Sequence, residues 1–345
     1  MATSDVSSVG FTRSKQSPIL IATRGSPLAL AQANLVLHQS RRAFPNLDFE
    51  IKTFKTTGDK MQSASLAQEG KALPKGLFTK ELETALLEDK ADLAVHSLKD
   101  LPTELPTGLK LGAVMHREDV RDVLVYRSAN FSQENSQCGG RGYAKGLTLD
   151  QLPNSAMVAT SSTRRRAQLL ARNSTLKAPE IRGNVLTRLD KLSRNMELDA
   201  TILALAGLTR LNFRITYDGS LQGDGVPPGL MATILETELM LPCVGQGAIG
   251  IEIREDDERM TTVCKGLNHA DTFQCVSAER AFLAAMGGGC QSPVAAFAEN
   301  LGKEIRLRAI SFVNGPARLA EARGPASEAV DLGRKLAAEL KVQHG

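Results

Sequence analysis

Short apolar runs alternate with amphipathic helical patterns along most of the chain. The runs are typical of buried strands, and they cover residues 17–23, 92–95, 156–160 and 200–206. Each run leads into a turn, and helical periodicity follows the turns at residues 24–27 and 161–162. Because strands that alternate with helices usually build parallel-rich sheets, this part of the chain predicts α/β domains.

The pattern changes near residue 271, where strands begin to follow one another. Helical periodicity predicts a helix at residues 276–286 and a last helix at residues 327–340. Between these helices, short runs predict strands at residues 293–298, 304–313 and 317–322. This order predicts a small α+β domain at the C-terminal end.

Two of the strand–turn–helix units have the features of an anion-binding site. In the first, Arg24 follows the strand, Ser26 is a helix N-cap and Pro27 takes the first helical position. In the second, a serine pair ending at Ser162 precedes an arginine-rich helix. Hydroxyls, helix N–H groups and arginines therefore meet at the carboxyl ends of strands, where α/β sheets bind ligands. The residues expected to face one cleft between two domains are Arg24, Asp100, Ser161 and Arg210.

The formal net charge of +4 excludes a wholly polybasic protein, but it conceals a basic segment. Residues 164–194 hold nine basic and two acidic side chains, a local charge of +7, so the rest of the chain carries −3. Most of the nine are arginines, which suit two-pronged binding of carboxylate or phosphate. The segment is compatible with a solvated helix face, a nucleic-acid surface or a site for a small polyanion. Because no aromatic side chains that could stack on bases interleave with these arginines, the small polyanion is favoured.

Two single residues, Asp100 and Cys290, carry candidate chemistry, and His96 is a third residue to weigh. Asp100 ends an apolar strand beside Lys99, and a carboxylate there could stabilise a developing cation or relay a proton. The alternative is an aspartate that only initiates a turn. Cys290 follows three glycines on a loop, which makes it either a tether for a cofactor or an incidental small residue. His96 is expected to be packed and hydrogen-bonded rather than catalytic.

The cysteines and the N-terminal residues bear on the compartment. Five scattered cysteines without a C-x-x-C pair indicate a reducing compartment, and they predict neither a metal site nor a disulfide framework. No apolar run approaches about 20 residues, so no membrane span is expected. The first 17 residues lack the apolar centre of a secretory signal. We expect a flexible tail and a cytoplasmic protein; the alternative is the remnant of a plastid transit peptide.

Eight short motifs occur in order, and together they resemble the porphobilinogen deaminase family. They are IATRGSPLAL at 21–30, KGLFTKELE at 75–83, AVHSLKD at 94–100, TSSTRR at 160–165, IRGNV at 181–185, LALAGL at 203–208, VGQGA at 244–248 and GGC at 288–290. Each motif is weak alone, but eight in the same order leave little room for coincidence. The resemblance spans the chain from about residue 18 to the C-terminus.

The resemblance implies a three-domain protein of the α/β class. It predicts two periplasmic-binding-protein-like α/β domains, with the active cleft between them, plus a small C-terminal α+β domain that carries the cysteine. The expected segments are a flexible tail (1–17), domain 1 (18–118 with 247–267), domain 2 with the arginine-rich cleft face (119–246) and domain 3 (268–345).

The resemblance also implies an activity, hydroxymethylbilane synthesis by a transferase. In the family a cysteine thioether holds a dipyrromethane cofactor, four porphobilinogen molecules are added head to tail with loss of ammonia, and water releases linear hydroxymethylbilane. Cys290 matches the tether, Asp100 matches the carboxylate that stabilises the cationic azafulvene, and Gln246 matches an interdomain hinge residue. The positions that match the cofactor and substrate cleft are Arg24, Ser26, Gln32, Lys75, Ser97, Lys99, Thr160, Ser162, Arg164, Arg165, Arg182, Gly183, Arg188 and Arg210.

The chain departs from the family pattern in a few places. The loops at residues 66–76 and 128–146 are longer than usual, and Ala295 stands where a glycine is common. We expect porphobilinogen as the substrate, a monomer, and neither a nucleic-acid nor a membrane partner. Two alternatives stay open: a non-catalytic protein of the periplasmic type that binds a small carboxylate, and a nucleic-acid binder that uses residues 164–194.

Overall fold

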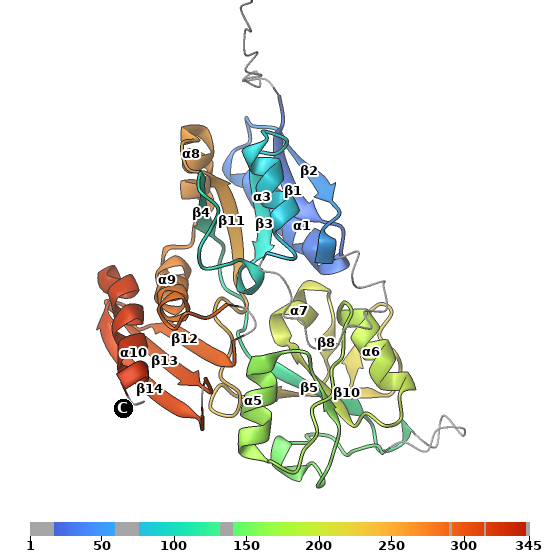
Figure 1. The fold of residues 1–345 in the computed structure, drawn as a ribbon. Helices are drawn as coiled ribbons and strands as arrows, with labels where there is room; N and C mark the ends of the chain where they lie inside the picture. Colours follow the sequence, from blue (N-terminus) through green and yellow to red (C-terminus); the bar gives the residue numbers. More distant parts are fainter. Residues whose placement is uncertain (1–16, 59–75, 132–140, 290–291, 314, 343–345) are drawn as a thin grey trace, which may run out of the picture.

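The computed structural model describes residues 17–58, 76–131, 141–289, 292–313 and 315–342. In these residues the chain forms three larger sheets, and helices pack beside each of them (Figure 1). A two-stranded ribbon is made by β8 (Arg214–Ile215) and β9 (Leu221–Gln222).

The first sheet has five strands in the order β2-β1-β3-β11-β4. The strands are β1 (Ile19–Arg24), β2 (Phe49–Phe54), β3 (Leu93–Ser97), β4 (Leu109–Val114) and β11 (Ile249–Arg254). The helices beside them are α1 (Pro27–Ala43), α3 (Lys80–Leu87) and α8 (Glu258–Leu267). Ile21, Val36 and Ile251 are fully buried in one core that joins β1, α1 and β11. Since β1 and β3 pair in parallel, their carboxyl ends lie side by side.

The second sheet has four strands in the order β10-β5-β7-β6. The strands are β5 (Asp122–Arg127), β6 (Val158–Ala159), β7 (Ala200–Ala204) and β10 (Leu230–Leu235). The helices are α5 (Thr163–Arg172), α6 (Val185–Arg194), α7 (Leu205–Arg210) and the short 3-10 helix η2 (Leu149–Gln151). Alternate residues of β5 belong to different apolar clusters, with Val123 in one and Leu124 in the other. The sheet is therefore covered on both faces.

Both sheets are mixed, so the expectation of parallel-rich sheets is only partly right. β1 pairs in parallel with β2 and β3, and β6 pairs in parallel with β7. In contrast, β11 and β5 are each antiparallel to both of their neighbours. The path of the chain explains this, because it crosses to the second sheet after β4 and returns to the first only at β11. A strand that enters from another sheet is not tied to the direction that a βαβ crossover imposes.

The third sheet is antiparallel, in the order β12-β13-β14. It consists of β12 (Val294–Asn300), β13 (Glu304–Ser311) and β14 (Arg318–Pro325). The helices α9 (Ala270–Ala285) and α10 (Ala329–Val342) pack against it and against each other, and the 3-10 helix η3 (Ala326–Glu328) precedes α10. Helix α9 begins before the expected residue 276, because His269 accepts the Thr272 N–H and caps an earlier turn. Two mixed α/β sheets and a small α+β unit agree with the expected fold class.

Several local predictions are confirmed. Ser26 accepts the Ala29 N–H at 3.3 Å and caps α1, with Pro27 in the first helical position. His96 is buried, and its Nε2 lies 2.9 Å from Glu252 Oε2. In contrast, residues 205–206, which were expected in a strand, begin α7.

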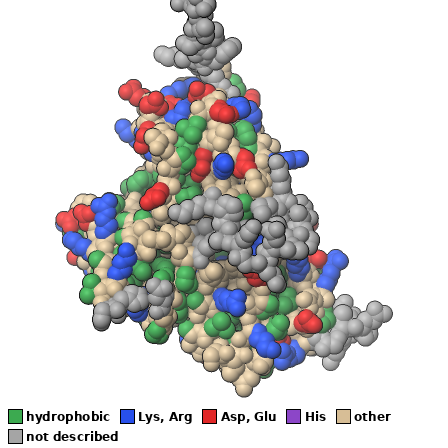
Figure 2. All heavy atoms as spheres, in the orientation of Figure 1, with side chains coloured by type: hydrophobic (Ala, Val, Ile, Leu, Met, Phe, Trp, Pro, Cys, Tyr) green, Lys and Arg blue, Asp and Glu red, His purple; other side chains and the backbone are tan. Residues whose placement is uncertain are grey.

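Among the described residues, charged side chains of both signs occur on the side that faces the viewer in Figure 2. No helix in the described part of the chain is long and apolar enough to cross a membrane.

Candidate active site

A cavity of about 340 Å³ is lined by residues from all three larger sheets and their helices. Its walls come from the turns after β1 and β3, from the starts of α5 and α6, and from the segment that returns to the first sheet. The connection between α9 and β12 contributes Gly289 and Ser292. Strand carboxyl ends and helix N-termini thus face one space, which is where α/β proteins bind ligands.

The charged side chains around this cavity are mostly cations. The charged residues in its described lining are Arg24, Lys99, Asp100, Arg164, Arg165 and Arg188. Five of these six are basic, and they come from both of the larger α/β sheets. Because charges interact more strongly in a partly enclosed space, the cavity is suited to a ligand with several carboxylates or phosphates.

Asp100 is positioned by the central strands of the first sheet. It ends the 3-10 helix η1 (Leu98–Asp100), which follows β3 directly, and Leu98 is buried. Since β3 lies between β1 and β11, the sheet fixes the position of this turn. Asp100 also interacts electrostatically with Arg188 of α6. Burial lowers the pKa of Arg188 to about 10, and the positive charge of Arg165 lowers it further, whereas the negative charge of Asp100 acts to raise it. The two sheets therefore interact electrostatically across the cavity.

A smaller hollow of about 60 Å³ lies beside Asp100. Gln32 of α1 and Ser97 of β3 line it, and Gln32 Nε2 donates to Ser97 Oγ at 2.9 Å. Arg24 lines both spaces, and its guanidinium carbon lies 4.3 Å from the centre of the Phe78 ring. The predicted residues that line one or both of these spaces from the first sheet are Arg24, Ser26, Gln32, Ser97, Lys99 and Asp100.

The second sheet contributes residues from its helix starts. Ser162 accepts the Arg165 N–H at 3.4 Å and so caps α5. Gly183 has a φ of +114°, and a Cβ there would lie 2.6 Å from Thr187 Cγ2. Its carbonyl accepts from Arg188 Nε at 2.8 Å, which fixes the side chain that reaches the cavity. A glycine is therefore required at this turn.

Arg164 and Arg165 line the cavity, but both also bind a buried carboxylate. Asp122, at the start of β5, accepts from Arg164 Nη1 at 2.8 Å and from Arg165 Nη2 at 2.7 Å. Burial acts to raise the pKa of Asp122, but the two arginines outweigh it and hold that pKa well below its usual range. These arginines therefore have a structural partner that the sequence did not reveal, because Asp122 is 42 positions from Arg164 along the chain.

Gln246, in the segment between β10 and β11, binds the same carboxylate. Its Nε2 donates to Asp122 Oδ1 at 2.9 Å and to the Val120 carbonyl at 2.6 Å. The two segments that connect the first and second sheets are thus tied together at Asp122. The one sequence signal for this contact is an aspartate that begins a mostly apolar strand, DVLVYR at residues 122–127.

A second buried ion pair joins these segments to the third sheet. Arg117 donates from Nε to the Gln246 carbonyl at 2.8 Å, and its Nη1 lies 2.7 Å from Glu279 Oε1. Glu279 is fully buried in α9 and also accepts the N–H groups of Gly245 and Ala298. All three larger sheets therefore meet in one network of buried charges, which sequence reasoning missed.

Three of the predicted positions lie outside the lining of both spaces. Arg182 is half exposed and pairs with Glu180 at 2.9 Å. Arg210 donates to the Gly247 carbonyl at 2.6 Å, and burial lowers its pKa to about 10. Thr160 is buried, and its hydroxyl accepts from a backbone N–H two residues later at 3.2 Å.

Two further predicted residues, Cys290 and Lys75, lie outside the described residues. The residues that flank the cysteine do lie within the described part. Gly289 and Ser292 both line the same cavity as Asp100.

Comparison with known proteins identifies the family to which the chain is similar. The model for "Porphobilinogen deaminase, dipyromethane cofactor binding domain" matches residues 19–262, and "Porphobilinogen deaminase, C-terminal domain" matches residues 273–342. The porphobilinogen deaminase of Paracoccus denitrificans (strain Pd 1222) is 42% identical over 334 residues, which is 94% of each chain. That of Syntrophomonas wolfei is 40% identical over 327 residues and covers 94% of this chain and 95% of that protein.

Similarity to solved structures is much weaker. The probable amino-acid ABC transporter extracellular-binding protein ytmK from Bacillus subtilis has a TM-score of 0.38 and 11% identity, over 73% of this chain and 90% of that one. The assignment therefore depends on the family models and the sequence relatives. On that evidence the chain belongs to the porphobilinogen deaminase family.

Proposed function

We propose that this chain joins four porphobilinogen molecules head to tail, with release of ammonia, into linear hydroxymethylbilane. The product grows on a dipyrromethane primer held by Cys290, which makes the protein a transferase of tetrapyrrole and haem biosynthesis. The observation that carries the proposal is the cavity whose described lining combines five cations with Asp100.

The donor set fits a cofactor and a substrate of this kind. Each pyrrole ring carries an acetate and a propionate, so a chain of rings needs several separate cations. Arg24, Lys99 and Arg188 come from three different elements, and they are placed to bind the carboxylates of different rings. When bound, the dipyrromethane supplies the pyrrole end that the substrate joins. Carboxylate clamps of this kind hold the reacting carbons in a productive orientation.

Asp100 supplies the negative charge near the reacting centre. Loss of the amine from porphobilinogen leaves a positive charge on the pyrrole, and a carboxylate fixed by β3 stabilises that charge without reorganisation. The carboxylate oxygens can also accept a proton and pass it on. Asp100 is therefore the residue to which we assign catalysis.

Arg164, Arg165 and Gln246 are assigned to positioning the two sheets. Their shared contact with Asp122 lies where the chain passes from the first sheet to the second and back again. This position supports a hinge between the two sheets. We accordingly divide the chain into a tail (1–17), domain 1 (18–118 with 247–267), domain 2 (119–246) and domain 3 (268–345).

We further propose that the protein acts as a monomer in the cytosol, without nucleic-acid or membrane partners. Three described cysteines, Cys243, Cys264 and Cys275, are free thiols, which supports a reducing compartment. A plastid is the alternative compartment.

Cys290→Ser tests the proposed tether. The purified wild-type protein should release ammonia from porphobilinogen and should be heavier than its chain by two pyrrole units in intact-mass spectrometry. The variant should retain the circular dichroism of the wild type but lose the added mass, because serine cannot form the thioether. A wild-type protein that binds small carboxylates but shows neither ammonia release nor added mass would contradict the proposed function.

A further inference from the structure

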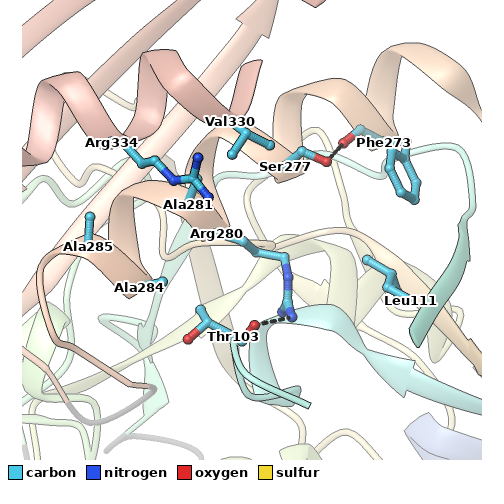
Figure 3. Close-up of a pocket in the computed structure, with 10 residues that line it drawn as sticks. All are labelled: Thr103, Leu111, Phe273, Ser277, Arg280, Ala281, Ala284, Ala285, Val330 and Arg334. Atoms are coloured by element: carbon cyan, nitrogen blue, oxygen red, sulfur yellow. Dashed lines mark hydrogen bonds between the residues drawn. The ribbon is translucent and has the colours of Figure 1, made fainter. Parts of the chain in front are cut away.

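A second hollow lies between the helices of the third sheet and the turn that follows Asp100 (Figure 3). Its volume is about 360 Å³, which is similar to that of the active-site cavity. Helices α9 and α10 line one side, and Thr103 and Leu111 line the side that belongs to the first sheet. The proposed reaction makes no use of this space.

The walls of the hollow are mainly apolar. Phe273 and Leu111 lie at one end of the view in Figure 3, and Val330 lies on the helix opposite. Val330 is 40% exposed although it is apolar. The volume is at the small end of the range for ligand pockets, which suits a ligand of one or two rings. An apolar ring would therefore gain from leaving water here.

Both charged residues in the described lining are arginines. Arg334 is exposed at the rim, and its side chain lies 3.3 Å from Asp331. Arg280 lies deeper, and its guanidinium donates to the carbonyls of Leu101 at 3.1 Å and Pro102 at 2.6 Å. Figure 3 shows a third, longer contact to the carbonyl of Thr103 at 3.4 Å.

The described hydrogen-bond partners of Arg280 are all neutral carbonyl oxygens. Among the described residues no carboxylate forms an ion pair with it. Burial lowers the pKa of Arg280 to about 10, and the more distant charge of Glu252 only partly opposes that shift. A desolvated guanidinium with neutral acceptors binds a carboxylate more strongly than it binds carbonyl groups.

We propose that this hollow is a second binding site, and that its ligand is a small aromatic monocarboxylate. The carboxylate binds Arg280, with Arg334 adding a second positive charge at the rim. The ring packs against Phe273 and the alanines of α9. Inorganic phosphate matches the charge but not the apolar walls, and a neutral aromatic compound matches the walls but not the charge.

Occupation of this site should affect the Asp100 turn. The carbonyls that Arg280 holds belong to the residues immediately after Asp100, so a carboxylate on the same guanidinium competes with them. This consequence depends on the role that the proposed function gives to Asp100. We expect the ligand to lower kcat for porphobilinogen and to leave KM nearly unchanged, because the arginines of the active-site cavity keep their positions.

Indole-3-acetate is a suitable probe for the purified full-length protein. Calorimetric titration should give a dissociation constant of about 1 mM, as expected for a ligand of about a dozen non-hydrogen atoms. Indole-3-acetamide, which lacks the charge, should bind at least about fivefold more weakly. Inorganic phosphate should not displace the probe.

Three variants locate the binding. Arg334→Glu reverses the rim charge and should weaken binding of the probe about fivefold. Lys335→Glu is the matched control, because it makes the same charge change on the next exposed residue of α10, outside the lining. Ala284→Leu fills the hollow from an exposed helical position and should abolish binding. All three variants should keep wild-type turnover when the probe is absent.

Two results would overturn the second site. One is the absence of binding at millimolar probe. The other is binding that Ala284→Leu leaves unchanged while the probe raises only KM, because the probe would then occupy the active-site cavity. Loss of turnover in the wild type without probe would instead contradict the proposed function, and the binding titrations would still decide on the second site.

Discussion

Asp122 controls the geometry of the site although we do not expect it to touch the substrate. It is fully buried, and Arg164, Arg165 and Gln246 all donate to its two oxygens. Removal of its charge would leave two buried guanidinium groups without an anion, which is far less favourable than the loss of a surface pair. One carboxylate thus maintains both the start of α5 and the contact between the crossing segments.

Asp122→Asn should lower the free energy of unfolding by about 3–5 kcal/mol at neutral pH, measured by urea denaturation. The pKa of Asp122 is lower in the folded state than in the unfolded state, so its contribution is complete above the unfolded value of about 4. As the pH falls below that value, the contribution is lost and the difference between wild type and variant should shrink. A difference that stays constant down to pH 3 would contradict this account.

Asp100→Asn should keep the fold and lose activity. Asp100 is only partly buried, so its replacement should change the free energy of unfolding by less than about 1 kcal/mol. Loss of the fixed charge at the reacting centre should lower kcat at least about 100-fold. The rate of ammonia release from porphobilinogen measures kcat, and urea denaturation provides the structural control. Normal turnover in the variant would refute the assignment.

At the scale of elements, the starts of α1 and α5 were predictable because their capping signals are local, whereas the start of α9 was missed because its cap is a histidine. Ser26 and Ser162 cap α1 and α5 through contacts within three residues. The partner of Arg164 and Arg165 was not predictable, because the interaction joins two segments that only the fold brings together. The antiparallel direction of β11 was not predicted either, because the apolar pattern of a strand does not show its direction within a sheet. Residues that act through distant partners therefore needed the structure.

Gly183→Ala should damage the start of α6. The positive φ costs about 1–2 kcal/mol for a residue with a Cβ, and the contact with Thr187 adds to it. Gly146→Ala is the matched control, because Gly146 has a φ of +78° and no atom near the added Cβ. Urea denaturation should show a larger loss for Gly183→Ala than for the control. The KM for porphobilinogen should rise in Gly183→Ala alone, because the Gly183 carbonyl holds Arg188.

At the scale of the whole molecule, the net charge of +4 is a poor guide to the site. Both signs are spread over the face in Figure 2, whereas the described lining of the cavity has five cations and one carboxylate. The basic residues that matter come from segments far apart in the sequence, so the basic segment at 164–194 predicted only part of the set. Three of its exposed members, Arg172, Arg182 and Arg194, pair with acidic side chains instead.

The position of β11 also has a consequence for synthesis of the protein on the ribosome. β11 lies between β3 and β4, yet its residues follow the whole second sheet in the sequence. A nascent chain that has emerged only as far as β10 can complete the second sheet, but its first sheet still lacks a central strand. We therefore expect the second sheet to become protease-resistant first in stalled nascent chains. The turn that carries Asp100 would then be fixed only after the ribosome has released residue 254.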